Sequence, residues 1–230
     1  MSVSSKDLPH FARDGTSARR HKALIIGFAV RAYAALEISP IMRAMAIRLK
    51  TKFRKKGPKT LEDRASVVAA NIWRIAQEIS RHMEKEGYAL GGDRQVAAVL
   101  TELIAFLIQI ADRIVYGQLT EEERGRFINA LGKHTARITS TNLAEFVGEG
   151  RYVGEFVSTL NARLADYSEL AFQGHDPSYS VLRYLGEKVS LAMEQTDSKW
   201  VLEQVVDIEG PEAVKLIKKS VGEIMGVKVT

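Results

Sequence analysis

Apolar residues recur every three to four positions along most of the chain, which is the spacing of one face of an α-helix. No segment alternates apolar and polar residues as a half-buried strand does. After the first sixty residues, the pattern predicts helices over residues 60–86, 93–116, 120–147, 151–172, 177–194, 198–208 and 211–225. The sequence therefore predicts an all-α fold, a multi-helix bundle of about six to eight helices.

The segment 93–116 is apolar almost all round, which is typical of a buried helix, so we expect it at the centre of the bundle. Thr60 is predicted to cap the helix over residues 60–86, and Thr120 and Glu123 form a capping box that starts the helix over residues 120–147. The polar run 139–142 could interrupt that helix. Asp176 is predicted to cap the helix over residues 177–194, with Pro177 at the first helical position. Gly210 is predicted to separate the last two helices.

Within residues 151–172, one apolar stripe is expected to face the core. Its members are Val153, Phe156, Val157, Leu160, Leu164, Tyr167 and Ala171.

Charge is distributed very unevenly. Residues 1–60 carry 14 Lys and Arg against 3 Asp and Glu, whereas residues 61–230 carry 19 against 25. The net charge of +5 is therefore the sum of +11 in residues 1–60 and −6 in residues 61–230. We interpret residues 1–17 as a flexible tail, 18–58 as a basic helical arm and 59–230 as the bundle domain. Such asymmetry indicates an anionic partner for the arm.

Residues 38–56 are predicted to form a basic amphipathic helix, with Ile38, Met42, Met45, Leu49 and Phe53 on one face. The predicted docking residues are Arg43, Arg48, Lys50, Lys52, Phe53, Arg54, Lys55 and Lys56. They would contact an anionic membrane surface or a partner protein. Nucleic acid is a further alternative, although Phe53 is the one stacking group interleaved with the cations. The same stripe could instead pack on the body.

Residues 23–42 have the length of a membrane span, but Arg31 and Glu37 near the middle oppose insertion. We expect a buried or surface-lying helix instead. Its apolar part, residues 23–38, would leave an exposed patch if it projected alone, and this predicts a homodimer.

A possible ligand site is predicted around His134, which falls on the apolar stripe of its helix with Glu145 on the same side. Glu102, Thr139 and Asn142 would complete this buried polar site for a small molecule or a metal. The alternatives are a core histidine bonded to a carbonyl or carboxylate, and a helix bend at the threonines.

Other charged residues have plainer interpretations. Glu78 and His82 stand four apart and could offer two metal ligands, but the chain lacks the Glu-x-x-His motif of di-iron bundles. Glu102, Asp112 and Arg113 lie on the predicted central helix, so we expect them to pair with groups on neighbouring helices.

The chain has no cysteine, which excludes disulfides, thiolate nucleophiles and Cys-based zinc sites. No phosphate-binding loop or serine elbow is present, and no cofactor is indicated. The sequence predicts a non-enzymatic accessory or scaffold protein of the cytoplasm, peripheral to a membrane. The alternatives are a small-molecule binder or enzyme built around His134, and a nucleic-acid-binding protein.

Overall fold

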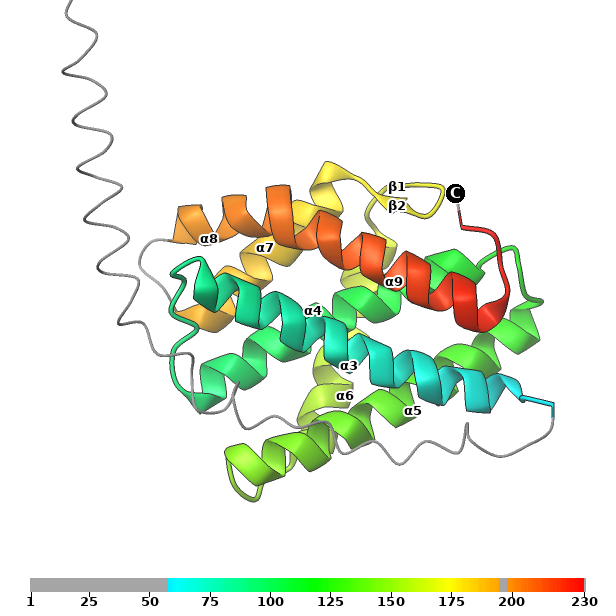
Figure 1. Ribbon diagram of the computed structural model, residues 1–230, viewed down its shortest axis with the longest axis horizontal. Helices are drawn as coiled ribbons and strands as arrows, with labels where there is room; N and C mark the ends of the chain where they lie inside the picture. Colours follow the sequence, from blue (N-terminus) through cyan, green and yellow to red (C-terminus); the bar gives the residue numbers. More distant parts are fainter. Residues whose placement is uncertain (1–57, 195–197, 230) are drawn as a thin grey trace, which may run out of the picture. The chain divides into compact units, whose positions relative to one another are not determined.

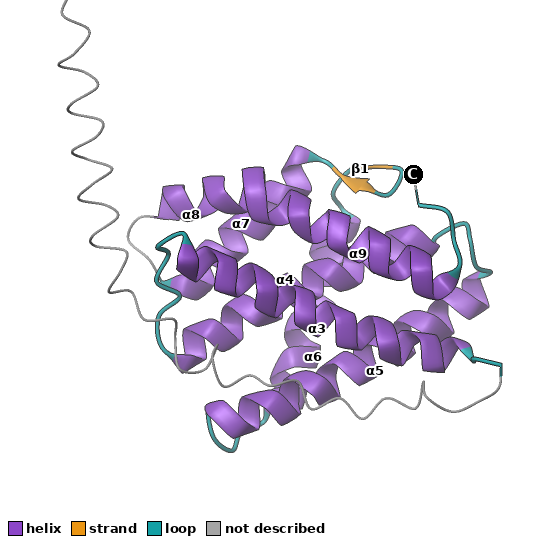
Figure 2. Cartoon of the chain, viewed as in Figure 1, coloured by secondary structure: helices purple, strands orange, loops and turns teal. Residues whose placement is uncertain are grey.

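The computed structural model describes residues 58–194 and 198–229. These residues fold into a helical bundle with a single two-stranded hairpin (Figures 1 and 2). The elements are α3 (Leu61–Lys85), α4 (Asp93–Val115), α5 (Glu121–Phe146), α6 (Tyr152–Ser168), β1 (Phe172–Gln173), β2 (Asp176–Pro177), α7 (Tyr179–Met193), α8 (Ser198–Gln204), the π-helical segment η2 (Val205–Glu209) and α9 (Gly210–Met225). The predicted all-α bundle is confirmed.

Helix α4 is the central helix, as its sequence predicted. It packs against α3, α5, α6, α7 and α9, and Figure 1 shows it crossing behind α3 and α9. Apart from the half-buried Ala97 and Ala98, its apolar side chains from Val96 to Val115 are fully buried. Burying one leucine or isoleucine stabilises a fold by about 1.5–3 kcal/mol, so α4 is the main source of hydrophobic stabilisation.

The two predicted helix starts are formed as expected. Thr60 Oγ1 accepts from the Asp63 amide, and the Asp63 carboxylate accepts from the Thr60 amide. Thr120 and Glu123 make the same reciprocal pair at the start of α5. Each capping box satisfies two backbone donors that a helix start leaves without intrahelical acceptors.

The interruption considered at the polar run within residues 120–147 does not occur. Helix α5 is continuous from Glu121 to Phe146. Its polar side chains bond to carbonyls of their own helix, Thr135 to Leu131 and Asn142 to Ile138. Because these bonds follow the i to i−4 direction, the polar run is accommodated without a break.

The prediction that Asp176 caps a helix beginning at Pro177 is wrong. Asp176 and Pro177 belong to β2, and α7 begins after Ser178. Gly174 supplies the positive φ of 62° that the short hairpin turn requires. Pro177 pairs with Phe172 in the hairpin, a position on an edge strand that a residue without an N–H can occupy.

Gly210 does not separate two helices. The chain continues from α8 through η2 into α9, and this run is drawn from orange to red in Figure 1. A Cβ on Gly210 would lie 2.8 Å from Leu182 Cδ2 and 2.8 Å from the Val205 carbonyl oxygen. The glycine therefore permits close packing of this run on α7.

The apolar stripe of α6 is only partly buried. Phe156, Leu160 and Tyr167 are in the core, whereas Val153 is 50% exposed and Val157 40% exposed. Helix α6 packs against α4 and α5. One edge of the predicted stripe is therefore on the surface.

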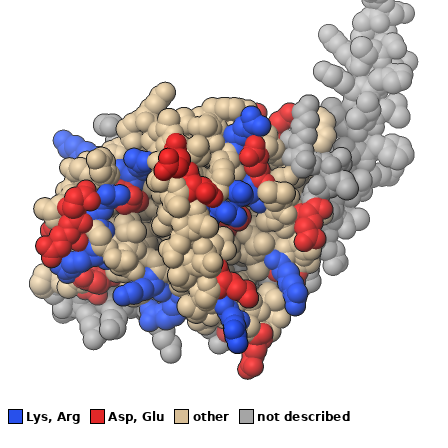
Figure 3. Space-filling model, turned by 180° about the vertical axis from the view of Figure 1, so that it is seen from behind, with Lys and Arg blue, Asp and Glu red and all other residues tan. Residues whose placement is uncertain are grey.

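The predicted tail, residues 1–17, and the predicted arm, residues 18–58, lie outside the described residues except for Pro58. The segment 23–42 that was considered as a membrane span lies outside them too. None of the helices in the described part of the chain combines the length and apolarity needed to cross a bilayer. On the face in Figure 3, acidic and basic side chains are interspersed rather than gathered into a patch of one sign.

Candidate functional site

The expected pair of His134 and Glu145 is not formed. The two residues stand eleven apart on the continuous helix α5, which separates them by about 16 Å along its axis. Glu145 is exposed, and His134 is half-buried with its Nδ1 atom 3.1 Å from Arg137 Nη2. Two residues on the same side of a helix are still separated along its axis, and at this separation their side chains cannot meet.

Thr139 and Asn142 are buried residues of α5. Asn142 donates to the Ile138 carbonyl, while Thr139 Oγ1 has no hydrogen-bond partner among the described residues. Glu102 is on α4 and faces a different neighbour, the helix α6. The structure therefore does not assemble the five predicted ligand-site residues into one site.

Glu102 forms a two-pronged ion pair with Arg163 of α6. Its Oε2 accepts from Arg163 Nε at 2.7 Å and its Oε1 accepts from Nη2 at 2.8 Å. The Glu102 side chain is 9% exposed and that of Arg163 is 20% exposed. Hydrogen bonding to Glu102 raises the pKa of Arg163, so the guanidinium stays charged. The expected partner on a neighbouring helix is confirmed.

Two tyrosines lie near the ion pair of Glu102 and Arg163. Tyr167 is buried against Phe106, and burial raises its pKa well above the ordinary range. Tyr184 of α7 donates to Asp166, and burial is also the main reason that its pKa is raised. These phenols therefore stay protonated at neutral pH.

Glu102 also lines a groove of about 470 Å³ between α4, α5 and α6. Both of its oxygens accept from Arg163, so the carboxylate links the two helices α4 and α6.

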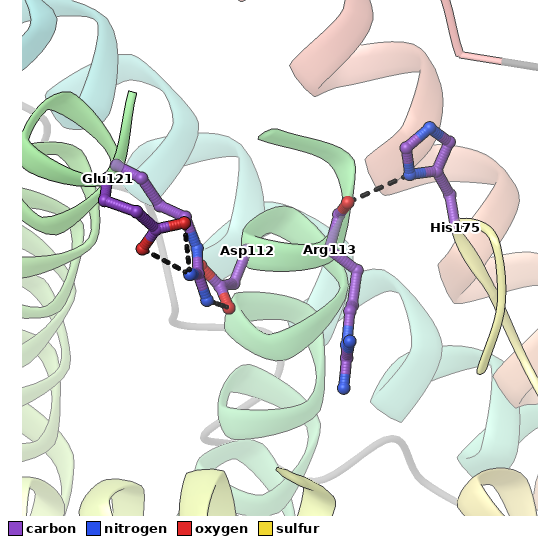
Figure 4. A network of polar contacts seen from close by, with 5 residues as sticks. Asp112, Arg113, Glu121 and His175 are labelled. Carbon is purple, nitrogen blue, oxygen red and sulfur yellow. Dashed lines mark hydrogen bonds and ion pairs between the residues drawn. The ribbon is translucent and has the colours of Figure 1, made fainter. Parts of the chain in front are cut away.

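Asp112 makes the corresponding link between α4 and α5. Its two oxygens accept from Arg124 Nε at 2.7 Å and Nη2 at 2.6 Å. Arg124 also bonds to the exposed Glu121, one helical turn earlier (Figure 4). Its guanidinium lies over the ring of Tyr116. Hydrogen bonding to Asp112 is the main cause of the raised pKa of Arg124. This expected pairing is confirmed too.

Arg113 departs from the expectation, because no carboxylate within the described ranges pairs with it. Its guanidinium stacks on Phe172, 4.5 Å from the ring centroid, and its backbone carbonyl accepts from His175 Nδ1 at 2.9 Å (Figure 4). Its Nε atom is buried and finds no acceptor in the part of the chain that the structure describes. Stacking contributes about 0.5–1 kcal/mol, whereas a buried donor left unsatisfied costs about 1–3 kcal/mol.

His82 binds a residue far away in the sequence rather than joining Glu78 in a metal site. Its Nδ1 lies 2.7 Å from Oε1 of Glu209, whose side chain is 1% exposed. Gln204 donates to the same oxygen at 2.9 Å, and Glu86 lies 3.8 Å from His82 Nε2. The hydrogen bond to Glu209 raises the pKa of His82. Across residues 58–194 and 198–229, no group of three or more acidic or histidine side chains could hold a metal.

Sequence reasoning missed three of these partners, namely Arg163, Arg124 and Glu209. Arg163 lies next to Leu164 and between Leu160 and Tyr167, at the edge of an apolar stripe, and that position was a usable signal. Nothing in the sequence indicated that Glu209 would meet His82, 127 residues away.

The predicted docking residues between Arg43 and Lys56 lie outside the described residues. Comparison of the chain with protein-family models, with curated proteins and with solved structures finds no match.

Proposed function

We propose that the protein is a non-enzymatic accessory protein that docks on an anionic membrane surface through residues 38–56 and presents its helical bundle for interaction with other proteins. The observation that carries this proposal is the charge split, +11 in residues 1–60 against −6 in the remainder. A cationic segment joined to a mildly acidic domain favours attraction of the segment, and not of the domain, to an anionic surface.

The pattern within residues 38–56 supports a membrane rather than a purely ionic contact. Apolar residues recur at helical spacing through Met42, Met45 and Leu49, and six cations are present between residues 50 and 59. A surface-lying helix uses both features, because its apolar face enters the acyl boundary while its cations meet lipid head groups. Each such cation contributes about 1 kcal/mol near an anionic surface.

The bundle supports the other half of the proposal. Its buried carboxylates Glu102 and Glu209 and its half-buried carboxylate Asp112 all bond to side chains on other elements, which is a structural use of charge. Val153 and Val157 remain exposed on α6, and exposed apolar side chains of this kind favour contact with another protein.

Flotation of the full chain with lipid vesicles tests the docking. We expect it to float with vesicles of phosphatidylcholine and phosphatidylserine but not with phosphatidylcholine alone. Changing Lys50, Lys52, Lys55 and Lys56 to Gln should abolish flotation. A matched variant changes four exposed lysines of the bundle, Lys85, Lys133, Lys219 and Lys228, to Gln and should float like the wild type.

Two results would contradict the proposal. Equal flotation of the two variants would show that the lysines of residues 50–56 have no special role in binding, because the same loss of charge in the bundle has the same effect. No flotation of the wild type would exclude membrane docking, and the cations would then be assigned to a protein or nucleic-acid partner.

A further inference from the structure

The central helix α4 is incompletely covered near its start. Ala97 and Ala98 are its two half-buried apolar residues, whereas all its other apolar side chains are buried. Thr101 lies one turn further on, and its hydroxyl donates to the Ala97 carbonyl at 2.8 Å, so this hydroxyl needs no partner outside α4. An apolar helix surface that is left open in this way is a place where another helix can bind.

This open surface is the floor of a long groove. The groove of about 470 Å³ that Glu102 lines adjoins a second one of about 630 Å³, and the two share Arg94, Ala98 and Val147. Together they form one continuous groove along the N-terminal half of α4, which we call the α4 groove. Its walls are the C-terminal end of α5, the N-terminal half of α6 and the C-terminal end of α7. Its apolar or small lining residues are Ala97, Ala98, Thr101, Leu143, Val147 and Phe156.

Tyr152 fixes one wall of the α4 groove. Its hydroxyl donates to the Gly148 carbonyl at 2.9 Å, and a Cβ on Gly150 would lie 2.7 Å from the Tyr152 Cζ atom. The ring therefore packs directly on the loop that carries Glu149, a residue of the groove. A wall that is already in place lowers the ordering cost of binding a ligand.

The rim of the α4 groove is acidic. Glu102 is neutralised by Arg163. The remaining charges are four carboxylates and one cation, and no cation in residues 58–194 and 198–229 forms an ion pair with any of the four. These charged residues are Asp93, Arg94, Glu149, Glu155 and Glu194. The groove therefore favours a cationic occupant.

The position of Glu194 does not serve the fold. Asp93 and Glu155 stand in the first turns of their helices, where the helix dipole stabilises a negative charge. Glu194 instead ends α7, where the dipole opposes a negative charge, and its φ of 52° is a conformation that favours glycine. Gln95 donates to it at 3.3 Å, but this neutral donor leaves the charge unbalanced. A cationic ligand accounts for a carboxylate at this place.

Residues 38–56 of the chain have the matching chemistry. They contain seven Lys and Arg and no Asp or Glu, and apolar residues recur at helical spacing from Ile38 to Phe53. We propose that this segment of one chain docks as a helix in the α4 groove of a second copy. Its apolar face would lie on Ala97 and Ala98, and its cations would meet the acidic rim. Reciprocal exchange of the two segments gives a two-fold dimer.

The position of Pro58 favours a second copy over the segment's own bundle. The α4 groove lies where α3 ends, because residues 86–92 lead directly from α3 to α4, and Figure 1 shows α3 beginning at the opposite end of the bundle. The 25 residues of α3 span about 36 Å. Six of the seven cations lie between Arg48 and Lys56, which a helix holds within about 12 Å of Lys56. In its own bundle, the segment would therefore keep its cations far from Asp93 and Glu194.

This inference concerns the protein without a membrane. The α4 groove and a lipid surface would compete for the same residues, so docking on vesicles would dissociate the dimer. The test below contains no vesicles, and flotation tests membrane docking separately. Flotation of the wild type without segment exchange would overturn this inference and leave the membrane docking intact.

Spin labelling of the full chain tests the exchange. The chain has no cysteine, so Thr51→Cys, outside the apolar face, gives a single site for a nitroxide. Spin-labelled ¹⁴N chains are mixed with unlabelled ¹⁵N chains, so that contacts between chains alone broaden the observed amide resonances. We expect broadening at Ala97, Ala98 and Val147 but not at Lys219 of α9, and reduction of the nitroxide should reverse it.

Sedimentation equilibrium of variants without the label measures the dimer. Ala98→Lys places a cation in the groove floor and should weaken dimerisation at least about tenfold, because the incoming segment is itself cationic. The matched control is Ala165→Lys on the exposed part of α6, which should dimerise like the wild type. Combined Glu149→Gln and Glu155→Gln should also weaken the dimer about tenfold, because an exchanged dimer loses four rim carboxylates. Combined Glu169→Gln and Glu223→Gln removes the same charge outside the groove and should have no such effect.

Unbroadened groove resonances in the mixed sample would overturn the proposal. So would broadening that occurs only when the nitroxide and ¹⁵N are on the same chain, because the segment would then occupy its own bundle. Equal dimer affinities of Ala98→Lys and Ala165→Lys would overturn it too. If Ala98→Lys fails to fold, equal affinities of the two glutamate double variants would overturn it instead.

Discussion

Glu102 and Arg163 form the most enclosed ion pair that links two helices of the bundle. Their side chains are 9% and 20% exposed, and two hydrogen bonds align the guanidinium with the carboxylate. A pair of this kind contributes little net free energy, yet the loss of one partner is costly because it leaves a buried charge without compensation.

We therefore expect Arg163→Ala to lower the free energy of unfolding by about 3 kcal/mol, the lower end of the range for buried pairs. The matched control is Arg183→Ala, which removes a pair with Glu187 whose side chains are 58% and 44% exposed and should cost less than about 1 kcal/mol. Urea denaturation of both variants measures the difference. Equal losses would contradict the structural role given to Glu102.

The contact of His82 with Glu209 predicts a pH-dependent stability. The folded-state pKa of His82 is raised above its ordinary value of 6.5. The stabilisation from this contact is thus fully present below about pH 6.5 and is lost as the pH rises through the folded-state pKa. The other charged groups near the imidazole are Glu86 and Lys85.

Between pH 6 and pH 9, the wild type should therefore lose more unfolding free energy than His82→Gln does. The effect should be modest, because 46% of the His82 side chain is exposed. Thermal denaturation across this range measures the difference, and an NMR titration of the His82 ring measures its pKa directly. A ring pKa below 6.5 would show that the assigned contact is wrong.

At this scale, the sequence predicted which charges needed partners but not all of the partners. Glu102 and Asp112 on an apolar helix had to be compensated. Arg113 was expected to pair in the same way and does not, since the ring of Phe172 takes that place. His134 and Glu145 do not pair, because they lie on the same side of α5 but about 16 Å apart along its axis.

Gly210 has an unusual role among the elements, because it lies where η2 passes into α9. The Leu182 side chain and the Val205 carbonyl each lie 2.8 Å from where its Cβ would be. Gly125 of α5 is the opposite case, with open space in front of it. The same substitution should therefore have opposite effects at these two sites.

We expect Gly210→Ala to destabilise the fold by about 1–3 kcal/mol through overpacking. Gly125→Ala should stabilise it by up to about 1 kcal/mol, because alanine is the better helix former. Differential scanning calorimetry of the two variants tests both signs. A stable Gly210→Ala variant would mean that the π-helical segment can shift to make room.

Elements with strong local signals were predicted well. The capped starts of α3 and α5 and the all-round apolarity of α4 depend on nearby residues alone. Pro177 misled the prediction, because proline suits both the first turn of a helix and an edge strand, and only the pairing with Phe172 distinguishes them. Gly210 was predicted to end a helix, whereas the structure requires a glycine there because Leu182 and the Val205 carbonyl leave no room for a side chain.

On the scale of the whole molecule, composition carried more functional information than any motif. The charge split is a property of the chain that no single helix displays. The predicted homodimer and the predicted docking residues depend on residues 18–56, which lie outside the described part of the chain. Both stay predictions, and so does the membrane-docking role that we propose for this cationic segment.

The most direct test of this account is the partition coefficient of the full chain on vesicles as phosphatidylserine content and salt are varied. Binding should rise with phosphatidylserine and fall with salt. Changing Lys50, Lys52, Lys55 and Lys56 to Gln should lower the coefficient by up to about a thousandfold, from about 1 kcal/mol per cation. A coefficient that is the same for the wild type and this variant, or insensitive to phosphatidylserine, would contradict the account.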